Sequence, residues 1–62
     1  MDSQQIDRAM RDRLPVVYEG RMYDRIIEYV SWYDESRKRH LSVVLIQGRC
    51  LHRVPADKVQ LA

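Results

Sequence analysis

The chain has 62 residues, a net charge of +2 and one cysteine. A chain of this length holds one domain and buries only about 60% of its unfolded surface, so we expect a single domain over residues 1–62 without a deep substrate cleft. The longest unbroken apolar run, Val43 to Ile46, is far shorter than the roughly 20 residues of a membrane-spanning helix. The lone thiol, Cys50, and the lack of a signal-peptide pattern predict a soluble, cytoplasmic protein without a membrane partner.

The charges are distributed unevenly along the chain. Residues 1–14 are neutral overall, residues 15–36 carry −3, and residues 37–62 carry +5. The small net charge therefore hides a basic C-terminal half, which favours an anionic partner for that half.

Residues 2–14 are predicted to form a short amphipathic helix. Asp2 and Gln5 have the spacing of a capping box, and Pro15 prevents the helix from continuing. An isolated helix of this length would be marginal in water, so we expect it to pack against the rest of the domain. Its apolar residues recur at spacings of three and four and share one stripe: Ile6, Ala9, Met10 and Leu14.

The chain after Pro15 is rich in β-branched and aromatic residues, and residues 16–61 are predicted to be β structure. We expect a short strand at 16–18, a turn at Glu19-Gly20 and one long strand over 23–33. A helix over residues 22–33 is the competing interpretation, because several apolar residues there also match helical spacing. We favour the strand because neither alanine nor leucine occurs between residues 15 and 36.

A hairpin with its turn centred on Ser36-Arg37 is predicted to follow. The remaining strands are expected at residues 40–47, 49–54 and 58–61, separated by a turn at 47–48 and a break at 55–57. The hairpin register would pair opposite charges and apolar groups across the strands: Glu35 with Lys38, Asp34 with Arg39, and Trp32 with Leu41. The predicted fold class is therefore mostly β, a small five-stranded barrel or meander preceded by one short N-terminal helix.

The segment from Arg53 to Leu61, with the sequence RVPADKVQL, resembles the end of a Src-homology-three domain. In that family a strand leads through a proline-started turn of tight helix into a last strand that begins with valine. The resemblance implies a small barrel, in which Pro55 and Trp32 would lie near the family's peptide groove. It does not imply binding of proline-rich peptides, because the family's long acidic and aromatic loop is missing between Tyr18 and Met22 and Lys58 replaces its usual tyrosine.

Cys50 and His52 are predicted to emerge on the same face of a strand, which raises the question of a metal site or a nucleophilic pair. Zinc needs three or four ligands, and only His40 remains as a further nitrogen donor. A nucleophilic pair would need an orienting group and oxyanion donors as well. We therefore expect a half-buried thiol beside a surface imidazole, with no metal and no cofactor.

The basic run at residues 37–40, with two aromatic residues nearby across the hairpin, is the best candidate for a binding site. Cations attract phosphates and aromatic rings stack on bases, so this combination would suit nucleic acid. The simpler interpretation, which we favour, is that these bases neutralise Asp34 and Glu35 within the hairpin. The candidate partner-binding residues are Trp32, Tyr33, Arg37, Lys38, Arg39 and His40.

The sequence therefore predicts a non-enzymatic module that binds a protein partner and is able to associate with itself. Tyrosine and tryptophan exceed what so small a core holds, and exposed aromatic residues are typical anchors of protein interfaces. The alternative hypothesis is an accessory protein that binds nucleic acid through the hairpin tip at residues 37–40.

Overall fold

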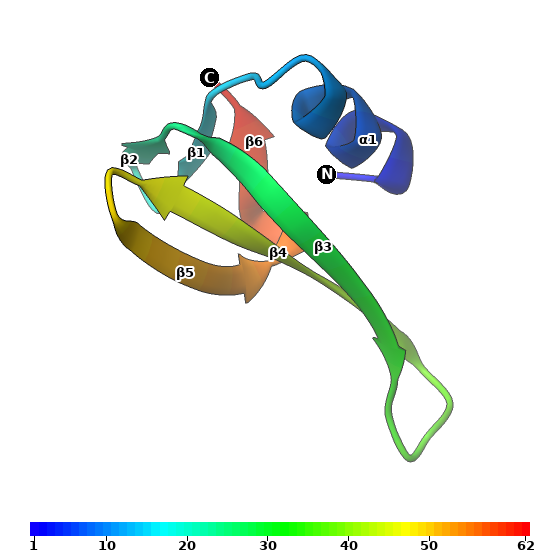
Figure 1. Ribbon diagram of the computed structural model, residues 1–62. Helices are drawn as coiled ribbons and strands as arrows, with labels where there is room; N and C mark the ends of the chain where they lie inside the picture. Colours follow the sequence, from blue (N-terminus) through cyan, green and yellow to red (C-terminus); the bar gives the residue numbers. More distant parts are fainter.

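The computed structural model describes all residues, 1–62, and contains one helix, six strands and one short 3-10 turn. The elements in chain order are α1 (Ser3–Arg11), β1 (Val16–Tyr18), β2 (Arg21–Tyr23), β3 (Arg25–Tyr33), β4 (Arg39–Gln47), β5 (Cys50–Pro55), η1 (Ala56–Lys58) and β6 (Val59–Leu61) (Figure 1). A mostly β fold with one short N-terminal helix is confirmed, and residues 22–33 are extended rather than helical.

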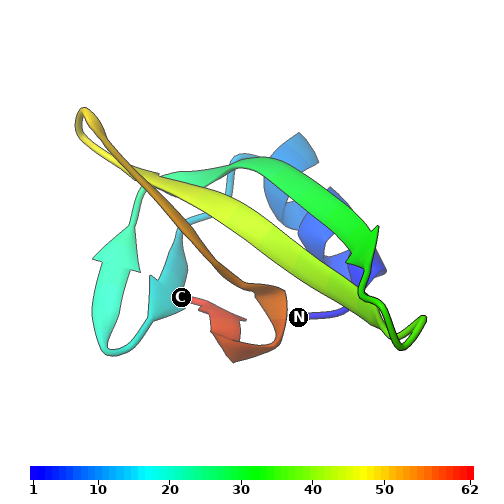
Figure 2. The ribbon, with the colours of Figure 1, turned by 90° about the horizontal axis from the view of Figure 1, so that it is seen from below.

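The strands form two antiparallel sheets of three strands each, in the orders β2-β1-β6 and β3-β4-β5. Figure 2 shows the two sheets one above the other, with α1 beside β3. The expected single barrel of five strands is not the observed arrangement, because six strands lie in two separate sheets.

The long strand expected over residues 23–33 is divided at Asp24, where the chain passes from one sheet to the other. The Asp24 N–H donates to the carbonyl oxygen of Ile46 at 2.8 Å, and the Asp24 carboxylate accepts the Gly48 N–H at 3.0 Å. Asp24 thus bonds to the β4–β5 end of the second sheet, so β2 and β3 belong to different sheets although they are almost continuous in sequence.

Helix α1 begins as predicted but ends earlier. Its capping box is present: the Asp2 carboxylate accepts the Gln5 N–H at 2.8 Å, and the Gln5 side chain accepts the Asp2 N–H at 3.2 Å. The helix stops at Arg11 instead of residue 14, because Arg13 adopts a left-handed conformation (φ 54°) and the Leu14 N–H reaches back to the Ala9 carbonyl at 2.9 Å.

Replacing Asp2 with alanine should lower the free energy of unfolding by about 1 kcal/mol, because an orphan N–H at the start of α1 loses its acceptor. Urea titration followed by far-ultraviolet circular dichroism measures the change. Asp7→Ala is the matched control, since Asp7 is an exposed helix residue outside the cap. Equal stability of the two variants would contradict the role of the cap.

The core lies between the two sheets and under α1. The helix contributes Ile6 and Ala9, both fully buried, which explains how so short a helix is held in place. Leu45 is the largest fully buried side chain of the strands. The complete buried set is Ile6, Ala9, Val16, Tyr23, Ile26, Val43, Leu45, Val54, Ala56 and Val59.

Candidate functional site

The β3–β4 hairpin projects beyond the body of the molecule (Figure 1). Its register differs from the predicted one by one residue: Trp32 lies opposite His40 instead of Leu41, and Tyr33 lies opposite Arg39. The predicted register was therefore wrong. The hairpin loop spans residues 34–38, and its geometry is imposed by the side chain of Asp34.

Asp34 organises this loop through three hydrogen bonds. One carboxylate oxygen, Oδ1, accepts the backbone N–H groups of Ser36 at 2.9 Å and Lys38 at 3.0 Å. The other, Oδ2, lies 2.8 Å from His40 Nε2. The bond to His40 first, and then those to the backbone N–H groups, hold the pKa of the Asp34 carboxyl below its usual value. Arg37 takes a left-handed conformation (φ 63°) to complete the turn.

Trp32 is held by the same arrangement. Its indole stacks on the His40 ring with the ring centroids 4.3 Å apart and the planes at 19°, while Asp34 fixes the other edge of that imidazole. The Trp32 residue nevertheless remains 42% exposed, and the neighbouring Tyr33 is 68% exposed. The hairpin therefore presents two accessible aromatic side chains, one of which is fixed in orientation.

The basic residues of the hairpin are not neutralised in the predicted way. Neither the Glu35–Lys38 pair nor the Asp34–Arg39 pair is present, and the Asp34 carboxylate is hydrogen-bonded to His40 instead. Arg39 Nε instead donates to Ser31 Oγ at 2.9 Å. The register explains this difference, because a shift of one residue moves the bases away from the acids that were expected to face them.

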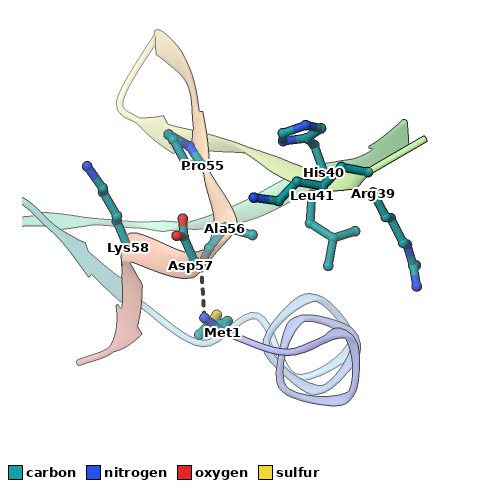
Figure 3. A pocket seen from close by; sticks show the side chains of 9 residues that line it. Met1, Arg39, His40, Leu41, Pro55, Ala56, Asp57 and Lys58 are labelled. Atoms are coloured by element: carbon teal, nitrogen blue, oxygen red, sulfur yellow. Dashed lines mark hydrogen bonds between the residues drawn. The ribbon is translucent and has the colours of Figure 1, made fainter. Parts of the chain in front are cut away.

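An open groove of about 480 Å³ lies between the start of β4 and η1 (Figure 3). Figure 3 shows His40 and Leu41 on one side, Pro55 and Asp57 on the other, and Met1 at the base, with the terminal ammonium donating to the Ala56 carbonyl at 2.9 Å. The lining residues are Met1, Lys38, Arg39, His40, Leu41, Pro55, Ala56, Asp57 and Lys58.

Three of the six predicted site residues, Lys38, Arg39 and His40, line this groove, while Trp32, Tyr33 and Arg37 do not. The sequence does not show that these residues lie close to η1, although the family resemblance places Pro55 near a groove. The missing information is spatial, because η1 reaches β4 only through the fold of the whole C-terminal half.

Cys50 and His52 have different surroundings in the structure. Cys50 is exposed instead of half-buried, and His52 packs its ring edge-on against Tyr23, with centroids 5.7 Å apart. No group of three metal-ligating side chains occurs in the structure. The helical part of the chain is also too short and too polar to cross a membrane.

Replacing Cys50 with serine should leave partner binding unchanged and alter the thermal midpoint only slightly, because surface substitutions away from special features usually change stability by less than about 0.5 kcal/mol. Differential scanning calorimetry and elemental analysis of the purified protein measure both properties. Stoichiometric zinc that is retained by the wild type and lost from Cys50→Ser would contradict the expectation that Cys50 is not a metal ligand.

Acid should destabilise the hairpin through Asp34. A carboxyl whose pKa is lowered by folding stabilises the folded state above its ordinary value of 3.8, and this contribution disappears as the pH falls through the lowered value. In thermal melts from about pH 6 to about pH 2, Asp34→Asn should therefore lose less stability than the wild type. Glu35→Gln is the control. An Asp34→Asn curve parallel to that of the wild type would contradict this role.

Comparisons of the chain with protein families, with characterised proteins and with solved structures found no match. The geometry of the hairpin and of the groove is therefore the basis for assigning a function.

Proposed function

We propose that this chain is a non-enzymatic binding module that engages a protein partner through the β3–β4 hairpin. The observation that carries the proposal is the exposed pair Trp32 and Tyr33, with Trp32 stacked on an imidazole that Asp34 holds in place. Tryptophan and tyrosine are enriched among the residues that contribute most to protein interfaces. A side chain that is already ordered before binding loses less conformational entropy on association, which favours affinity.

The chemistry of the hairpin supports binding over catalysis. The His40 imidazole bonds to Asp34 and stacks on Trp32, and no serine, cysteine or lysine nucleophile is hydrogen-bonded to it. A covalent mechanism needs a nucleophile hydrogen-bonded to its general base, and His40 has none. We place the module in the cytoplasm, where a free exposed thiol such as Cys50 stays reduced.

A Src-homology-three-like arrangement is part of the same proposal. Pro55 ends β5 immediately before η1, and Val59 begins β6, in the order that the family resemblance implies. The short β1–β2 turn leaves no long loop beside the groove. We therefore expect the partner to contact the projecting hairpin rather than to lie as a proline-rich peptide in the groove.

Nucleic acid is the second candidate, and the groove beside η1 favours it. Lys38, Arg39 and Lys58 line this groove together with His40, against one acid, Asp57. A basic concavity of this kind attracts phosphates, and the unneutralised bases of the hairpin strengthen the attraction. Net charge weighs against this candidate, because a total of +2 is small for a domain that binds nucleic acid.

Affinity capture with matched variants tests the protein-binding proposal. The wild type, Tyr33→Ala and a triple Arg37→Gln, Lys38→Gln, Arg39→Gln variant are immobilised, and retained proteins are identified and then titrated as purified components. We expect a partner that binds the wild type and the triple variant but not Tyr33→Ala. A partner lost only from the triple variant, or retained equally by all three, would contradict the proposal.

A further inference from the structure

The β3-β4-β5 sheet has an outer face that no other element covers. Residues directly opposite each other in antiparallel strands point to the same side of the sheet, and successive residues alternate. Because Val43 and Leu45 are buried in the core, Val44 and Ile46 point outward. Helix α1 and the second sheet both pack on the inner face, because their buried residues Ile6, Val16 and Val59 belong to the same core as Val43 and Leu45. The outer face is therefore left open.

This outer face is mainly apolar. Val44 and Ile46 on β4 are half-buried, and Leu51 on β5 is 59% exposed. Val30 and Trp32 on β3 and Pro55 on β5 extend the apolar surface, as the pairing of Val30 with Ser42, Trp32 with His40 and Ser42 with Pro55 indicates. The same pairings place Arg25, Ser42 and His40 on this face, so the apolar residues form a patch with polar residues among and around them. An exposed apolar patch bordered by polar residues marks an interaction surface.

Two opposite charges flank the centre of the face. Val44 pairs with Glu28 on one side and with Arg53 on the other, so the three residues form one row across the sheet. Glu28 and Arg53 are both exposed, and neither takes part in an ion pair within the chain, because Val44 lies between them. If a second copy of this row is laid over the first in the reverse order, Glu28 of each copy faces Arg53 of the other, and the charges are complementary.

We propose that a second copy of this chain packs on this face, related to the first by a twofold axis parallel to β4. This inference rests on the proposed function, of which it names one partner. Rotation about such an axis exchanges the positions of β3 and β5 and keeps β4 over β4. It places Glu28 of each copy opposite Arg53 of the other, and Val44 opposite Val44, in the aligned manner of packed sheets.

A twofold axis that also lies in the plane between the two sheets, but perpendicular to β4, is unfavourable. That rotation would stack Glu28 on Glu28 and Arg53 on Arg53, and like charges placed together across an interface disfavour association. The axis parallel to β4 also places Trp32 of each copy beyond Pro55, the last residue of β5, in the other copy.

Sedimentation equilibrium of the purified full chain and of charge-swapped variants tests this arrangement. We expect a reversible wild-type dimer whose dissociation constant increases at least about tenfold in Glu28→Arg and in Arg53→Glu, because each change creates two like-charge contacts per dimer. The double variant with both changes should recover wild-type association. An equimolar mixture of the two single variants should form heterodimers, since their opposite charges then face each other at both positions.

Controls keep the test specific. Glu35→Arg makes the same charge change at the hairpin tip and should leave the dimer unchanged, and circular dichroism checks that each variant is folded. A wild type that stays monomeric up to about 1 mM would overturn the inference, as would a double variant that associates as weakly as the single ones. Tyr33→Ala separates the two proposals: it should abolish capture of the hairpin partner but leave the dimer intact, so either proposal can fail while the other stands.

Discussion

Replacing Leu45 with alanine should lower the free energy of unfolding by about 2–5 kcal/mol, the range for truncating a fully buried leucine. The loss has two sources, the transfer of apolar surface and the cavity that neighbouring side chains fill only partly. A core of ten buried residues leaves a domain of this length little stability in reserve. We therefore expect Leu45→Ala to be substantially unfolded at 37 °C, as measured by thermal and urea denaturation.

Met22→Ala is the matched control for this experiment. Methionine is close to leucine in size, but Met22 is 60% exposed on β2, so little packing is lost when it is shortened. Its effect should stay below about 1 kcal/mol. Equal destabilisation by the two substitutions would contradict the placement of the core between the sheets.

Replacing Trp32 with alanine should weaken binding of the protein partner by about 2 kcal/mol or more, which corresponds to roughly a thirtyfold loss of affinity. Removing Arg37, Lys38 and Arg39 together by glutamine substitution should change the affinity much less, because charges at the rim of an interface act mainly on the association rate. Isothermal titration calorimetry with the captured partner measures the equilibrium effect, and stopped-flow fluorescence measures the rates.

Tyr33→Ala provides the control for folding effects in this comparison. Trp32 stacks on His40, so its removal also affects the hairpin itself, and the thermal midpoint must be measured in parallel. Tyr33 is 68% exposed, so its removal should weaken binding with little change in stability. A larger loss of affinity in the triple variant than in either aromatic variant would reverse the assignment.

Local signals predicted the elements well. The capping box of Asp2 and Gln5 is complete within a few residues of sequence, so the start of α1 was found correctly. The turn at Glu19-Gly20 is equally local: both residues have positive φ, 51° and 76°, which suits a tight hairpin with glycine at its second position. Such features depend only on residues that are neighbours in the chain, so they can be predicted from the sequence.

Side-chain hydrogen bonds decided the features that sequence reasoning missed. Charge pairing suggested the hairpin register, but the Asp34 carboxylate binds two backbone N–H groups and His40, which fixes a loop over residues 34–38. In the same way, Asp24 bonds to the far end of β4 and to Gly48, which divides the expected long strand. These bonds join residues whose proximity is created by the fold, so a pattern of residue types does not show them.

The sequence suggested candidate residues in the hairpin but not their geometry. Trp32 and Tyr33 were identified from their aromatic character, whereas the stacking of Trp32 on His40 depends on the corrected register. The outer face around Val44 was not identified either, because the run from Val43 to Ile46 is apolar at every position and does not reveal which side chains enter the core.

A salt titration of nucleic-acid binding by the wild type and the triple Arg37, Lys38, Arg39 variant distinguishes a protein interface from a phosphate-binding hairpin. If the hairpin is a protein interface, short DNA and RNA should bind the two proteins similarly and with dissociation constants well above about 10 μM at near-physiological salt. Micromolar, salt-sensitive binding by the wild type that is abolished in the triple variant, or weakened with a salt slope smaller by up to about three, would contradict a protein interface and make phosphate the ligand.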